Sequence, residues 1–88
     1  MPIELFTEVA LSRDLPEEGL CRGDVATVVE LLPGASASAG EAGCILEVFN
    51  AVGETIAVVS VPVSAVVPLQ PGEVLSVRRR CALTHPTG

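Results

Sequence analysis

The stretch IAVVSVPVSAVVPL, residues 56–69, decides the fold of this 88-residue chain. Eight of its 14 residues are Val, Ile or Leu, and six of these are Val. Branching at the β carbon costs little rotamer freedom on a pleated surface and packs well there, so such a stretch favours strands over helices. The chain has no Trp, no Tyr and only two Phe. The sequence therefore predicts a small all-β protein with an aliphatic core.

The segments before this stretch alternate in the manner of strands joined by turns. A first strand is predicted over residues 3–11, and the clearest one is DVATVVELL, residues 24–32, in which both faces are largely apolar. Such a strand is central or lies at an interface. Residues 44–50 and 54–61 are predicted to form a hairpin whose turn contains Gly53.

The connections complete the predicted architecture. Residues 12–24 are rich in turn formers and form a structured loop, whereas residues 35–43 are small and flexible. Residues 62–66 suit a single 3-10 turn before a short strand at residues 67–69. Residues 73–81 are compatible with a last strand or with a short helical segment. These elements predict an SH3-like barrel of five or six strands with one 3-10 turn.

One domain is expected over residues 1–81, followed by a C-terminal tail over residues 82–88. A chain of this length is too short for two independent cores. The sequence shows no internal repeat.

The segment DLPEEGLCRGDVATVVE, residues 14–30, resembles a family of small bacterial proteins known as domain of unknown function 4926. Members share an apolar opening strand, a DLPxxGL loop, a GxxGTVVE strand and a later element with two prolines. The matching parts of this chain are residues 5–11, 14–20, 23–30 and 61–69. Ala26 stands where members tend to carry Gly, so the backbone there needs no positive φ. The resemblance implies the fold and a bacterial origin, and it brings no activity.

The charges of the chain argue against a nucleic-acid binder. Eleven acids oppose five Arg and no Lys, for a net charge of −6, whereas phosphate binding needs a surplus of cations. All the acids precede Arg78, Arg79 and Arg80. This run can bind an acidic partner or the acidic face of a neighbouring subunit, and the alternative is a solvated strand end.

Four acids crowd the first loop, namely Asp14, Glu17, Glu18 and Asp24. Their spacing does not match a calcium loop. Asp14 is expected to cap the turn with its carboxylate, and Glu17 and Glu18 to face water. Long loops anchored on a rigid scaffold are common recognition surfaces. The residues predicted to bind a partner are therefore Asp14, Glu17 and Glu18, together with Arg78, Arg79 and Arg80.

No catalytic, cofactor or metal site is expected. His85 is the only histidine, and Cys21, Cys44 and Cys81 show no clustered spacing for zinc or for a disulfide framework. The N-terminal residues lack the pattern of a signal peptide, and the 14-residue apolar stretch is too short to cross a bilayer. The expected compartment is the cytoplasm, with the thiols reduced.

The apolar content exceeds what one small barrel can bury. Hydrophobic residues make up 49% of the chain and the mean hydropathy is +0.56. Exposed apolar surface usually marks an interface, so a homo-oligomer is expected, most simply a two-fold dimer. The expected function is a non-catalytic protein-interaction module. The alternative is an accessory protein of the antitoxin or immunity type that neutralises a basic partner.

Overall fold

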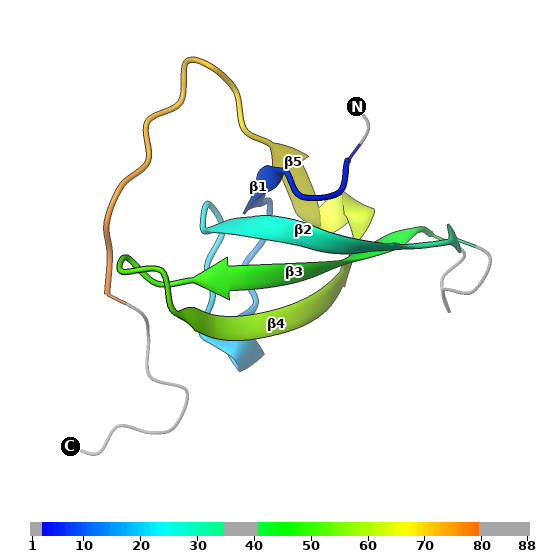
Figure 1. The fold of residues 1–88 in the computed structure, drawn as a ribbon, viewed down its shortest axis with the longest axis horizontal. Helices are drawn as coiled ribbons and strands as arrows, with labels where there is room; N and C mark the ends of the chain where they lie inside the picture. Colours follow the sequence, from blue (N-terminus) through cyan, green and yellow to red (C-terminus); the bar gives the residue numbers. More distant parts are fainter. Residues whose placement is uncertain (1–2, 35–40, 80–88) are drawn as a thin grey trace.

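The computed structural model describes residues 3–34 and 41–79 and is all-β, as predicted. Five antiparallel strands form one sheet in the order β4-β3-β2-β1-β5 (Figure 1). The strands are β1 Glu8–Leu11, β2 Val25–Leu32, β3 Gly43–Phe49, β4 Thr55–Pro62 and β5 Val66–Pro68. The 3-10 turns that lie wholly within the described residues are η1 Pro16–Glu18 in the first loop and η3 Val63–Ala65 between β4 and β5. The hairpin of β3 and β4 and the 3-10 turn before the last strand are confirmed.

The sheet must curl because β4 and β5 follow each other in the chain yet lie at its opposite edges. The four Cα-to-Cα steps from Pro62 to Val66 span at most about 14 Å. The outer strands of a flat five-stranded sheet are about 19 Å apart. Register shifts between β2 and β3 and between β3 and β4 leave Val29 and Ile56 as extra residues, and such bulges bend strands.

The curled sheet stays open rather than closing into the expected barrel. No ladder joins β4 to β5 in the described part of the chain. Instead η3 bridges the gap at one end: Val63 N–H donates to Ala42 O at 3.0 Å, and Ser12 N–H donates to Ala65 O at 2.7 Å. The first contact continues the pairing of β3 with β4 and the second continues the pairing of β1 with β5, so neither of them pairs β4 with β5.

The concave face of the sheet encloses one aliphatic core. In β3 the predicted alternation is confirmed, since Leu46 and Val48 are buried and Glu47 faces outward. Leu46 pairs with Val28 on one side and with Val59 on the other, so the three form a continuous buried row. The buried side chains contain no polar or charged group in the described residues. The core consists of Val9, Leu11, Leu20, Ala26, Val28, Cys44, Leu46, Val48, Val59, Val61, Ala65 and Val66.

The first strand is shorter than predicted because the chain turns at its start. Phe6 has a positive φ of 61°, and the Thr7 hydroxyl donates to Glu4 O at 2.7 Å. Phe6 N–H donates to Val28 O at 2.6 Å, and Val28 N–H donates to Thr7 O at 2.9 Å. Two residues thus oppose one, which is a bulge. Regular pairing begins only at Glu8, and not at residue 3.

Within the described residues, the chain beyond β5 adopts neither the strand nor the helical segment left open for residues 73–81, of which residues 80 and 81 lie outside the description. Residues 73–79 form no strand and no helix. We call residues 70–79 the C-terminal arm; it begins with a turn in which Glu73 N–H donates to Gln70 O at 3.0 Å. The predicted tail at residues 82–88, and residues 35–40 of the predicted flexible loop, lie outside the described residues.

The substitution Val28→Ala is expected to lower the free energy of unfolding by about 1–3 kcal/mol, because the fully buried side chain leaves a cavity. Val58→Ala is the matched control, since Val58 is also in a strand but is 60% exposed. Val58→Ala is expected to change the free energy of unfolding by no more than about 0.5 kcal/mol. Urea denaturation of both variants measures the difference. Equal losses for the two would contradict the position of the core.

Candidate functional site

The first loop is a packed and hydrogen-bonded excursion from the sheet. Leu15 and Leu20 form an isolated bridge, with Leu15 N–H donating to Leu20 O at 2.8 Å. Leu20 is only 2% exposed and anchors the loop in the core. Between them, η1 ends at Gly19, which takes the left-handed conformation at φ 71°. The predicted structured loop is therefore present, and its position relative to the sheet is well defined.

The three acids predicted to bind a partner on this loop fall into two groups. The Asp14 carboxylate accepts a hydrogen bond from Arg22 N–H at 2.8 Å, so it closes the loop as expected. Glu17 and Glu18 lie in η1 and are exposed. The loop thus presents an acidic tip whose backbone is held by Asp14 and by the buried Leu20.

Asp24, at the end of the loop, joins this region to the C-terminal arm. Arg78 forms a salt bridge with the Asp24 carboxylate, and the Nε of Arg78 donates to Oδ1 of Asp24 at 2.9 Å. A second group on the guanidinium donates to Gly19 O at 3.4 Å. Cys21 N–H donates to the other carboxylate oxygen at 2.8 Å. Asp24 and Arg78, which are 54 positions apart in the sequence, are therefore in direct contact.

These contacts shift the pKa of Asp24 below its ordinary value. Burial of the carboxyl group by itself raises its pKa, because burial disfavours the charged form. Hydrogen bonds from Arg78 and from Cys21 N–H, together with the positive charge of Arg78, favour the charged form and outweigh that effect. Asp24 is therefore ionised at neutral pH and serves as the anchor of the arm.

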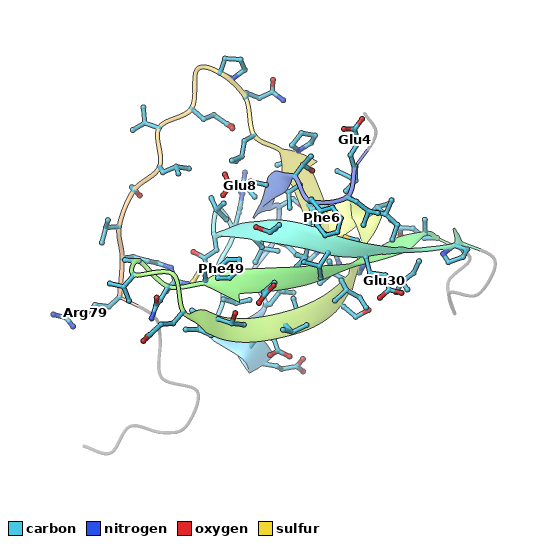
Figure 2. All side chains as sticks on the ribbon, in the orientation of Figure 1. Glu4, Phe6, Glu8, Glu30, Phe49 and Arg79 are labelled. Carbon is cyan, nitrogen blue, oxygen red and sulfur yellow. The ribbon has the colours of Figure 1, made fainter. Side chains whose placement is uncertain are left out.

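The predicted run of arginines is divided by this contact. Arg78 faces its own chain, whereas Arg79 is exposed and points away from the sheet in Figure 2. Arg80 lies outside the described residues. Sequence reasoning placed Arg78 with the candidate partner-binding residues and did not pair it with Asp24. Nothing in the spacing of the two residues could have identified the pair.

The arm spans a cavity instead of packing on the sheet. In Figure 1 the arm, coloured yellow to orange, leaves β5, arcs outward and passes the turn between β3 and β4. The cavity beneath it measures about 890 Å³. The cavity is lined by arm residues 73–78 and by residues 48–52 and 22–25. Val74 and Val77 are 91% and 92% exposed, so the arm presents apolar side chains to solvent.

A second exposed apolar region lies on the sheet itself. Phe6 is 74% exposed and Figure 2 shows it over β2, while Phe49 lies over β3. Val58 of β4 is 60% exposed. β4 is also an edge strand, since it pairs with β3 alone in the described sheet. This edge and its exposed valine form the longest open border of the sheet.

The remaining candidate chemistry is sparse in the part of the chain that the structure describes. No group of three or more His, Cys, Asp or Glu side chains is placed to hold a metal ion there. Cys44 is fully buried in β3, and burial raises the pKa of its thiol, as suits a structural cysteine. His85 and Cys81 lie outside these residues. No helix in the described ranges has the length and apolar content to cross a membrane.

Comparison with known proteins identifies a family and no characterised relative. A family model described as a domain of unknown function, DUF4926, matches residues 5–68. The match includes the five strands, the acidic loop and Asp24, and it ends before the C-terminal arm. No curated protein and no solved structure matches the chain.

The substitution Arg78→Gln is expected to release the end of the arm, because it removes the charge that Asp24 holds. Backbone NMR order parameters of residues 74–77 should then fall below about 0.6, the range of flexible chain. Arg79→Gln is the matched control and should leave them unchanged. Equal order parameters in Arg78→Gln and the unaltered protein would show that the salt bridge does not hold the arm.

The salt bridge between Asp24 and Arg78 is expected to break in acid. Because the pKa of Asp24 is lowered, the ion pair stabilises the folded chain at pH above 3.8, the ordinary aspartate value. That contribution is lost as the pH falls through the lowered pKa. A carbon-13 NMR titration of the Asp24 carboxyl group should show a midpoint below 3.8, and a higher midpoint in Arg78→Gln. A midpoint at or above 3.8 in the unaltered protein would rule out the ion pair in solution.

Proposed function

We infer that this chain, which belongs to the family of domain of unknown function DUF4926, is a non-catalytic protein-interaction module that associates with a second copy of itself. The observation that carries the proposal is the open edge of β4. This strand has eight residues, Thr55–Pro62, and contains no charged residue. Soluble proteins usually protect such edges with charges, bulges or covering segments, because unpaired backbone groups invite another strand.

The exposed apolar side chains of the described residues also support the proposal. Ten large hydrophobic side chains of the described residues are 42% exposed or more, on a chain whose core has 12 residues. They are Leu5, Phe6, Leu31, Phe49, Val52, Val58, Val67, Val74, Leu75 and Val77. Covering part of this apolar surface would remove it from water and so favour association.

A two-fold dimer is the simplest assembly that would use the β4 edge. In such a dimer the same patch of both copies contributes to the interface, so like charges on the patch would repel. The uncharged sequence of β4 avoids that repulsion. Exposed strand edges also bind extended peptides by strand addition, which gives the module a mechanism for recognising protein partners.

The proposed module acts in the cytoplasm and does not bind nucleic acid. Its three cysteines suit a reducing compartment, and its net charge of −6 would repel phosphates. The acids of the loop tip, Glu17 and Glu18, suit a basic protein surface instead.

The exposed acidic tip favours a second candidate function, an accessory protein that neutralises a basic partner. Glu17 and Glu18 stand on η1 and are held by a loop with fixed hydrogen bonds, so they need little reordering on binding. A gene for a basic toxin beside the gene for this chain would favour this function over self-association.

The self-association is tested by sedimentation of the full chain at micromolar concentration, where a mass of about twice 9.0 kDa is expected. Val58→Lys should shift the protein toward monomer, because a lysine on an edge strand opposes pairing. Val52→Lys is the matched control, since Val52 is 79% exposed but lies in the turn before β4. A mass of one chain for the unaltered protein would overturn the proposal.

A further inference from the structure

The middle of the C-terminal arm has no bonding partner in the described chain. Residues 74–77, with the sequence Val-Leu-Ser-Val, form no hydrogen bond with any described residue. Val74, Leu75 and Val77 are 91%, 62% and 92% exposed. Backbone N–H and C=O groups pair with one another or with water, and a β-branched sequence favours pairing in a strand. Residues 74–77 therefore have backbone groups and apolar side chains that are free to pair with the edge of a sheet.

The arm does not lie along β4 of its own chain. The salt bridge of Arg78 with Asp24 holds its end beside the start of β2. In the sheet, β3 separates β2 from β4. The arm instead crosses the cavity near the turn between β3 and β4 (Figure 1). Both ends of the arm are attached to one subunit, so its middle projects as a loop.

We propose that residues 74–77 of the arm add as a strand to the open β4 edge of a second copy. This inference rests on the proposed self-association and names the segment that makes the contact. The arm and the β4 edge both carry unpaired backbone donors and acceptors. Pairing the two segments would satisfy these groups and cover apolar side chains of both. An arm held at both ends loses less entropy on binding than a free tail does.

The charges beside the two segments select the direction of pairing. Arg79 follows the apolar part of the arm, and Glu54 immediately precedes β4. An antiparallel arrangement brings the end of the arm to the start of β4, and so places Arg79 near Glu54 of the second copy. Opposite charges placed in this way fix the register of an interface more than they add affinity.

The exchange is reciprocal in a two-fold dimer. Each copy contributes one arm and one β4 edge, so the assembly is closed and does not grow into a filament. The arm emerges after residue 68, where the family match ends. The proposed dimer contact therefore joins β4, which lies within the family match, to the arm, which lies beyond it.

The test compares two variants of the full chain. The arm variant combines Val74→Asp and Val77→Asp, and the control variant carries Phe6→Asp alone. Both valines of the arm are over 90% exposed, so the fold should be unaffected. Sedimentation should show the dimer dissociation constant of the arm variant raised at least about 10-fold. Phe6 is 74% exposed and lies beside β2, away from the arm and from the β4 edge, so Phe6→Asp should leave the constant unchanged.

Hydrogen exchange supplies a second readout on the unaltered chain. The amides of residues 74–77 should gain protection as the protein concentration rises through the dimer dissociation constant. If the arm variant dimerises normally while Val58→Lys does not, the β4 edges pair with each other and the proposed arm contact is wrong. If the unaltered chain stays monomeric, the proposed self-association fails as well.

Discussion

The short connection between β4 and β5 is the constraint on which the rest of the structure depends. Strands that are neighbours in sequence occupy opposite edges of the sheet, and η3 is too short to cross a flat sheet of five strands. The sheet therefore curls, and the curl gives it a concave side. Only on such a side can short aliphatic residues such as Val28 and Leu46 be enclosed by one layer of strands. Bulges at Val29 and Ile56 provide the bend.

The same curl leaves the sheet incomplete. β4 and β5 approach each other at η3 but form no ladder, so the uncharged edge of β4 stays open in the described chain. A core made of small residues also leaves many apolar side chains outside, because a thin interior has few positions to fill. The proposed protein-interaction role would use both the open edge of β4 and the exposed apolar side chains.

The contact of Asp24 with Arg78 connects the sheet to the arm, and competing electrostatic effects determine its strength. Burial of the Asp24 carboxyl group disfavours its charge, while the guanidinium and a backbone N–H favour it. The result is an ionised anchor at the boundary between the first loop and β2. It holds the end of the arm beside the start of β2, while apolar residues of the arm line a cavity.

The sequence by itself determined the elements that depend on neighbouring residues: the alternation that buries Leu46, the turn at Gly53, the packed loop before β2 and the 3-10 turn after β4. Periodicity and turn chemistry act over a few residues and are legible in one chain. Only the tertiary structure decided that the chain turns at Phe6, that the sheet stays open, and that Arg78 reaches Asp24. These features depend on pairing register and on contacts between distant residues, which no local pattern encodes.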